Sequence, residues 1–131
     1  MLVLDTCAMI LDALDPSKVG KKAFSAIAKA DEQGQLACCD ISLWEIAMLV
    51  AKGRLDPGTD ALHFIDLVLA ARKIEVLPIT AAIAYKSALP DFCPHGDPAD
   101  RLIAATAVLH RAKLATSDRK LNVVAGLQVV W

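Results

Sequence analysis

Four acidic residues occupy positions in this sequence from which they could carry out chemistry. Asp5 and Asp118 follow short apolar segments typical of buried strands. Glu45 lies just past another such segment, and Asp100 lies in the first turn of a predicted helix. Open α/β folds place their sites where the parallel strands end, at a single edge of the sheet. We therefore expect these four side chains to gather into one acidic cluster.

Four bare carboxylates in one cleft would repel each other strongly, so some of them would be protonated or would destabilise the fold. A divalent cation removes this conflict. A set of oxygen ligands without Cys or His suits Mg²⁺ or Mn²⁺. The pattern therefore predicts a metal centre with Asp5, Glu45, Asp100 and Asp118 as its ligands and catalytic residues.

Each of these acids also has a structural explanation. Acidic residues are favoured at helix N-termini, because they interact with the positive end of the helix dipole. Asp97 suits the N-cap of a helix whose first residue is Pro98. Ser42 and Glu45 have the spacing of a capping box. Asp40, five residues before Glu45, is the alternative candidate for the second acidic position.

The composition favours a single domain over residues 1–131. The hydrophobic fraction is 56% and mean hydropathy is +0.46, yet no apolar run approaches the roughly 18–20 residues that span a bilayer. No basic segment precedes the first apolar run, so we expect neither a signal peptide nor a membrane anchor. Four cysteines without metal-ligand spacing suit a reducing, cytoplasmic location. The net charge of −1 excludes a uniformly basic nucleic-acid-binding surface.

Strand-like and helix-like segments alternate along the chain. The expected strands are 1–4, 36–39, 74–77, 113–116 and 127–130, and the expected helices are 6–14, 18–33, 42–52, 60–72, 80–88 and 98–111. Helices between strands imply parallel pairing with helical crossovers. We therefore predict an α/β fold, a three-layer α/β/α sandwich around a four- to five-stranded parallel sheet.

The helices expected over 42–52 and 60–72 carry more apolar residues than one core-facing stripe requires. A short connection suggests that they form an antiparallel hairpin. Its groove could take a helix or an extended segment of a partner protein, and the same surface could form a homodimer. The alternative is that these side chains fill the core. The residues concerned are Trp44, Met48, Leu49, Leu62, Ile65, Val68 and Leu69.

These segments together resemble the PIN-domain ribonucleases, and most closely the VapC-type toxins of type II toxin–antitoxin systems. The resemblance spans nearly the whole chain in the expected order. The departures are small: Ala99 stands where a bulky aromatic residue is frequent, and Asp40 where a small or neutral residue is usual. The matching segments are Leu-Val-Leu-Asp5-Thr6, Ile-Ser-Leu-Trp-Glu45-Ile-Ala-Met-Leu, His95-Gly-Asp97-Pro-Ala-Asp100-Arg101-Leu-Ile-Ala-Ala-Thr-Ala and Ala-Thr116-Ser117-Asp118.

The resemblance implies a PIN-like fold, Mg²⁺-dependent endonuclease cleavage of RNA and an antitoxin as protein partner. The acids at matching positions would bind the metal, which would activate a water molecule for attack on phosphorus. The family's principal acid in the third segment corresponds to Asp100, which leaves Asp97 a supporting role. Single-stranded or looped RNA is the expected substrate, because a narrow acidic cleft needs a splayed backbone.

Several other residues are candidates for supporting roles around the metal. Thr6, Thr116 and Ser117 are plausible hydrogen-bonding partners of the ligands or of phosphate. Arg101, Arg119 and Lys120 could contact flanking phosphates. A structural role is the more frequent one for residues such as His95 and Arg101.

Three other classes of protein share part of this pattern. A haloacid-dehalogenase-like phosphatase would need a second Asp two residues after the first, where this chain has Cys7. A response-regulator-like receiver would need an acidic pair at the end of the first strand and a Lys after the fifth; neither is evident. A PIN-fold module that binds a ligand without catalysis would be expected to lack some of the four acids, and all four are present.

Overall fold

The structure of the protein is a computed structural model that describes all residues from 1 to 131. Five strands form one sheet in the order β3-β2-β1-β4-β5, and every neighbouring pair is parallel. At the centre, Leu4 pairs with Cys38 on one side and with Ala115 on the other. The strands are β1 (Leu2–Leu4), β2 (Leu36–Cys39), β3 (Glu75–Leu77), β4 (Lys113–Ala115) and β5 (Gln128–Val130).

Helices connect these strands. Two short 3₁₀ helices follow α1 and β4. The α-helices are α1 (Thr6–Leu14), α2 (Lys21–Glu32), α3 (Ile41–Ala51), α4 (Ala61–Ala71), α5 (Ala81–Ala88) and α6 (Pro98–Leu109), and the 3₁₀ helices are η1 (Pro16–Lys18) and η2 (Arg119–Val123).

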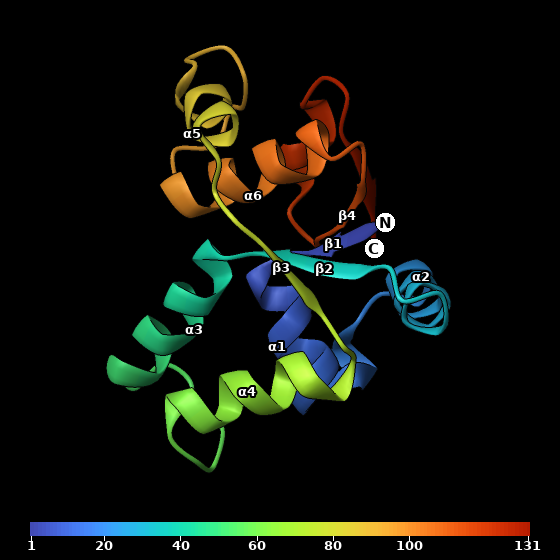
Figure 1. The fold of residues 1–131 in the computed structure, drawn as a ribbon, viewed down its shortest axis with the longest axis vertical. Helices are drawn as coiled ribbons and strands as arrows, with labels where there is room; N and C mark the ends of the chain where they lie inside the picture. The colour runs from blue at the N-terminus through green and yellow to red at the C-terminus, as the bar shows by residue number, and fades with distance from the viewer.

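The central strands are buried on both faces, which explains their continuous apolar sequences. Leu2 and Leu4 of β1 pack into one core with α1, α2, α3 and α4. Val3, between them, packs into a second core with α6 and η2. Figure 1 shows the result: α1 and α4 lie on one side of the sheet, and α6 lies on the other with α5 against it. The predicted three-layer sandwich is confirmed, with five strands.

The order of the strands reverses direction between β1 and β4. The chain builds outward from β1 through β2 to β3, and then returns to the other side of β1 to add β4 and β5. Connections from neighbouring strands therefore leave in opposite directions at this point, which opens a crevice at the carboxyl ends of β1 and β4. Asp5 and Asp118 follow these two strands, so the topology places both at the crevice.

The predicted strands and helices are all present, with ends that differ from the prediction by up to three residues. The prediction that Ser42 and Glu45 form a capping box is wrong. Helix α3 already begins at Ile41, so Ser42 lies inside the helix and is buried. Its hydroxyl and the Glu45 carboxylate both meet Thr6 on α1, and neither forms a hydrogen bond with the α3 backbone.

No helix of the protein combines the length and the apolar character needed to cross a bilayer.

Candidate active site

Asp5 is the most deeply buried acid of the predicted cluster. It is the N-cap of α1, and its Oδ1 accepts a hydrogen bond of 2.7 Å from the backbone N–H of Ala8. Burial is the largest cause that raises the pKa of Asp5, and the charges of Asp100 and Asp118 raise it further against hydrogen bonds from Thr116 and Ala8. A carboxylate with such a pKa lacks a positive partner. The capping role and the metal-binding role are thus compatible in one side chain.

Glu45 reaches the same cluster from α3. Its Oε1 accepts a hydrogen bond from the Thr6 hydroxyl, which also lies 3.0 Å from the Ser42 hydroxyl. Burial raises the pKa of Glu45, and the charges of Asp100, Asp97 and Asp5 add to this, while the bond from Thr6 opposes it. Thr6 therefore orients a carboxylate of the cluster, as expected for a supporting residue.

His95 joins the other two acids. Its Nε2 is 2.6 Å from Oδ2 of Asp118 and 3.1 Å from Oδ2 of Asp100. The Nδ1 atom accepts the backbone N–H of Asp97 at 3.2 Å. Because Nδ1 is an acceptor here, the ring proton resides on Nε2, which donates to the carboxylate of Asp118. His95 thus holds Asp100 and Asp118 together at the mouth of the crevice.

The cluster has an excess of negative charge. Burial also raises the pKa of Asp100, followed by the charge of Asp97, with His95 acting in the opposite direction. Asp5, Glu45 and Asp100 therefore all have raised pKa values, and the charges of the acids contribute to each of them. The structure brings these three residues and Asp118 together from four separate parts of the chain.

The residues present fit a hard divalent cation. One side-chain atom each of His95, Asp100 and Asp118 lies within 4.8 Å of the other two, a spacing that a single bound cation could bridge. Since Nε2 of His95 carries a proton, the donors of this set are carboxylate oxygens, which suit Mg²⁺ or Mn²⁺. A cation here would also offset the repulsion that raises the pKa values of the neighbouring acids.

Two supporting candidates after β4 have different surroundings. Thr116 is buried, hydrogen-bonds to the carboxylate of Asp5 and accepts the backbone N–H of Asp118 at 3.1 Å. Ser117 is exposed, so its hydroxyl is free to meet a ligand. Asp118 itself caps η2 by accepting the backbone N–H of Lys120 at 3.0 Å. Thr116 is therefore a link between two candidate ligands, Asp5 and Asp118.

Asp97 and Arg101 flank Asp100 on α6 with different tasks. Asp97 is the exposed N-cap of α6, and its Oδ1 accepts the backbone N–H of Ala99 at 2.9 Å. The guanidinium of Arg101 donates to four backbone carbonyls, those of Ser87, Leu89, Cys93 and His95, at 2.6 to 2.9 Å. Arg101 therefore holds the loop that carries His95, and this geometry disfavours the phosphate contact considered from the sequence.

Asp40 does not share the environment of Glu45. One carboxylate oxygen accepts the backbone N–H of Ile79 at 3.2 Å, and the other lies 3.8 Å from the thiol sulfur of Cys39. These contacts fix the end of β2 to the segment that follows β3. The geometry therefore favours Glu45 over Asp40 as the second acid of the cluster.

Two residues of the site were not identified as such from the sequence. For His95 the sequence favours a structural role over a functional one, although its position two residues before Asp97 is a usable signal. Cys7 lies near Asp5, Glu45 and Asp100, and loss of hydration together with their charges raises the pKa of its thiol. A raised pKa keeps Cys7 in the thiol form, so it is a poor nucleophile.

The apolar residues of α3 and α4 divide into two groups. Trp44 is 60% exposed and Leu62 is 71% exposed. Val68 is buried in the core, and Ile65 and Leu69 pack against the core from partly buried positions. Met48 and Leu49 are half-buried. The core therefore takes part of this set, and Trp44 and Leu62 remain free to meet a partner.

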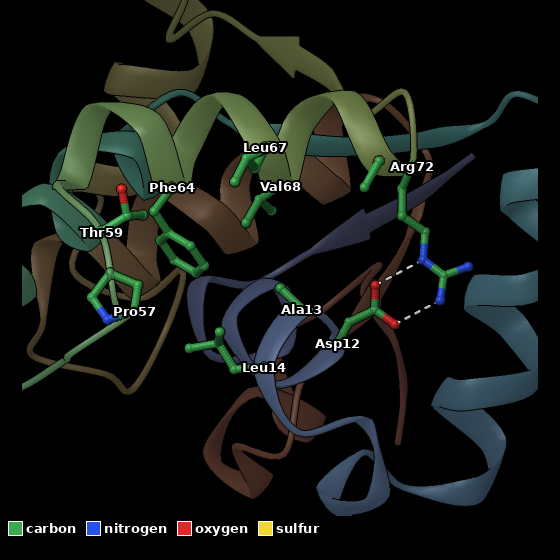
Figure 2. Close-up of a pocket in the computed structure, with 10 residues that line it drawn as sticks. Asp12, Ala13, Leu14, Pro57, Thr59, Phe64, Leu67, Val68 and Arg72 are labelled. Atoms are coloured by element: carbon green, nitrogen blue, oxygen red, sulfur yellow. Dashed lines mark hydrogen bonds and ion pairs between the residues drawn. The ribbon is translucent and has the colours of Figure 1, made fainter.

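Apart from the acidic crevice, a concavity lies between α1 and α4, on the side of the sheet that α3 and α4 cover. Its volume is about 380 Å³, and it is lined mainly by apolar side chains, among them Leu14, Phe64 and Leu67. Figure 2 shows Arg72 at one end, with two hydrogen bonds to the carboxylate of Asp12, at 2.8 and 2.9 Å. Arg72 also donates to Asp31 at 3.0 Å, so its charge is balanced within the protein.

Comparisons with known proteins agree with this arrangement. The PIN domain family model matches residues 2–127. Ribonuclease VapC22 of Mycobacterium tuberculosis (strain ATCC 25618 / H37Rv) is 37% identical over 122 residues, which cover 92% of this chain and 89% of that protein.

Solved structures of similar proteins share the fold. VapBC2 from Rickettsia felis, bound to a DNA fragment from the promoter, superposes with a TM-score of 0.73 at 18% identity, covering 98% of this chain and 96% of that one. A toxin–antitoxin complex from Klebsiella pneumoniae gives a TM-score of 0.62 at 22% identity, covering 100% and 97%. The match to the family model and the 37% identity to VapC22 show that the chain belongs to the PIN-domain family, as a member of the VapC type.

Proposed function

We propose that this protein is a divalent-metal-dependent endoribonuclease and the toxin of a toxin–antitoxin pair. The observation that carries the proposal is the convergence of Asp5, Glu45, Asp100 and Asp118 at one edge of the sheet. Burial and the charges of neighbouring acids raise the pKa values of Asp5, Glu45 and Asp100, which indicates an unbalanced negative charge. The similar protein VapC22 is named a ribonuclease, which supports the choice of RNA as substrate. Four free thiols suit action in the reducing cytoplasm.

Each acid has a role that follows from its contacts. Asp5, Asp100 and Asp118 are the proposed ligands, and a Mg²⁺ or Mn²⁺ ion held by them would supply Lewis acidity and a more acidic water molecule. Glu45 is held by Thr6 with its other oxygen free of protein hydrogen bonds, and it accepts the proton of the attacking water. Thr116 and His95 position the ligands rather than touch the substrate.

The expected substrate is single-stranded or looped RNA. The cluster lies in a crevice between α1, α3 and α6, and a cation there must be reached by a phosphodiester group. Sequence-specific proteins bind RNA mostly where the strand is unpaired and the backbone can be splayed.

The test is cleavage of a labelled single-stranded RNA by the purified protein with Mg²⁺, with Mn²⁺ and with EDTA. Cleavage should depend on the cation, and EDTA should abolish it. Undiminished cleavage in EDTA would contradict the metal centre. Binding of RNA without any cleavage would identify a non-catalytic PIN-fold module instead.

An antitoxin is the proposed protein partner, and the exposed apolar residues of the α3–α4 hairpin are its proposed contact. A similar structure was solved as a toxin–antitoxin complex, which supports a partner of this class. Trp44 and Leu62 offer apolar area that the core does not use. The same surface is the proposed interface of a homodimer. Co-expression with the product of the neighbouring gene, followed by co-purification and size-exclusion chromatography, tests both assemblies.

A further inference from the structure

A polar pocket of about 300 Å³ lies beside the acidic cluster, at the carboxyl ends of β4 and β5. It differs from the concavity between α1 and α4 because most of its lining is polar. The side chains that matter come from the start of α2, from η2 and the segment before it, and from the end of the chain: Lys22, Ser117, Asp118, Arg119, Asn122 and Trp131.

The pocket adjoins the proposed metal centre through Asp118. One carboxylate oxygen of Asp118 meets Nε2 of His95 at 2.6 Å, and the same residue lines the pocket. Ser117, which precedes it, is exposed in the pocket wall. A polymer that places one phosphodiester group at the carboxylates can therefore place its neighbouring unit in this pocket.

The cationic side chains of the pocket are not balanced within the protein. Neither Lys22 nor Arg119 has an acidic oxygen within 4.0 Å, whereas Arg72 has carboxylates of two residues. Both side chains are exposed. With Asp118 as the one acidic side chain of the lining, the two unpaired cations leave the pocket with an excess of positive charge, which suits an anion such as phosphate.

Trp131 forms an aromatic wall of the pocket, and it packs closely against the backbone at Gly20. A Cβ atom at Gly20 would lie 2.4 Å from the backbone of Trp131 and 2.7 Å from its ring, so only glycine allows this approach. The ring is half-buried and packs on the edge of the core, so its position is fixed before any ligand binds. Asn122 offers an amide that can both donate and accept hydrogen bonds.

We propose that this pocket binds one nucleotide of a single-stranded RNA, the unit next to the cleaved bond. Lys22, Arg119 and the Ser117 hydroxyl contact its phosphate, and its base lies against Trp131 within reach of Asn122. Proteins that bind single strands combine these elements, a basic groove for the backbone and aromatic side chains for the bases. The inference rests on the proposed function, because it assumes that the RNA strand continues from this pocket to the metal centre. Binding in the pocket itself does not require cleavage.

The first experiment measures binding separately from cleavage. The Asp100→Asn protein, in EDTA, is titrated into a fluorescently labelled single-stranded RNA, and anisotropy gives the Kd. Adding Lys22→Gln and Arg119→Gln should weaken binding at least tenfold and reduce the slope of log K against log salt by about 1.4, that is, 0.7 for each of two phosphate contacts. The matched control, Lys113→Gln with Arg111→Gln at the opposite edge of the sheet, should leave the Kd unchanged. Equal affinities in the two double variants would overturn the proposal.

The second experiment uses the tryptophan itself. The chain has only two tryptophans, so Trp44→Phe leaves Trp131 as the single reporter. Nucleoside monophosphates and a short RNA should quench its fluorescence, and the Lys22→Gln, Arg119→Gln pair should remove this response. Quenching by inorganic phosphate to the same extent would show a simple anion site and overturn the assignment of a nucleotide, as would the absence of any quenching.

The two experiments also separate this inference from the proposed function. If nucleotides quench Trp131 but the protein cleaves no RNA with any cation, the pocket is supported and the ribonuclease assignment fails. If RNA is cleaved with unchanged KM by the Lys22→Gln, Arg119→Gln protein, the ribonuclease assignment is supported and the pocket fails. Both substitutions fall on exposed side chains, and a thermal melt verifies that the variants are folded.

Discussion

The acidic cluster and the concavity between α1 and α4 both contain charged groups, but these groups are paired with opposite charges only in the concavity. In the concavity, the guanidinium of Arg72 is balanced by Asp12 and Asp31, and the remaining lining is mainly apolar. In the cluster, four carboxylates share a half-buried crevice with a single histidine. The charges of the concavity stabilise the fold, whereas those of the cluster oppose each other.

This difference supports the proposal that the cluster, and not the concavity, is the reactive region. Carboxylates gathered without a positive partner cost stability, because burial and the neighbouring charges make Asp5, Glu45 and Asp100 harder to ionise than they would be in water. Such an arrangement persists where function requires it. The concavity can contribute apolar area to binding, but it presents no unbalanced group to a substrate.

The largest effect is expected from Asp100→Asn. Removing one proposed ligand should reduce RNA cleavage more than a hundredfold, since even residues that only support metal ligands contribute about 10–100-fold. The melting temperature of the metal-free protein should stay the same or rise, because repulsion with Asp97 and Asp118 is relieved. Asp66→Asn on the exposed surface of α4 is the control and should change neither quantity. Full activity of the Asp100→Asn protein would contradict the proposal that the acidic cluster, unlike the concavity between α1 and α4, carries out the chemistry.

Glu45→Gln should have the next largest effect. Gln keeps an oxygen that can accept the hydrogen bond from Thr6, so stability should change little, while activity should fall about 10–100-fold if the carboxylate serves the metal or the water. Asp40→Asn keeps an oxygen for the N–H of Ile79 and should leave activity nearly intact. Cleavage assays on both variants decide between the two acids, and the reverse result would move the site to Asp40.

Arg72→Met should affect the fold rather than the chemistry. Asp12 is only 7% exposed, so loss of its partner leaves a nearly buried charge. Because Arg72 itself is 30% exposed, we expect a loss of about 1–3 kcal/mol in the free energy of unfolding, less than for a fully buried pair. Urea denaturation measures this loss, with Arg54→Met as the exposed control. Activity per folded molecule should remain unchanged, and a selective loss of kcat would connect the two regions.

The pH dependence of stability should distinguish the regions as well. The raised pKa values of Asp5, Glu45 and Asp100 mean that the folded protein binds more protons than the unfolded chain in the range between the ordinary and the raised values. The free energy of unfolding of the metal-free protein should therefore decrease as the pH rises through that range. Thermal melts against pH should show this slope, and Asp100→Asn or added Mn²⁺ should reduce it. An unchanged slope in both cases would show that the cluster carries no such strain.

The smallest effect on stability is expected from Trp44→Glu and Leu62→Glu. Both side chains are largely exposed, so the free energy of unfolding should change by no more than about 0.5 kcal/mol. Cleavage should also persist, whereas co-purification with the antitoxin should fail. Unchanged assembly of both variants would place the partner elsewhere, with the concavity of Figure 2 as the next surface to substitute.

The sequence by itself determined the architecture and the four acids that the fold brings together. Buried parallel strands require apolar runs such as 2–4 and 36–39, and helices between them leave little choice but a layered parallel sheet. In such a sheet the strand ends share one edge, so Asp5 and Asp118 can be placed from their positions in the chain alone. The match of 2–127 to the PIN domain model agrees with that interpretation.

The tertiary structure alone decided which polar groups meet. Ser42 and Glu45 have the spacing of a capping box, but Thr6 from another helix binds them instead. Arg101 lies in a charged motif, yet its guanidinium donates hydrogen bonds to backbone carbonyls, one of them 14 residues away in the sequence. Periodicity reports which face of an element is buried, whereas the partner of a polar side chain depends on distances between segments remote in sequence. For the same reason the contact of Gly20 with Trp131, and with it the polar pocket, has no signal in the sequence.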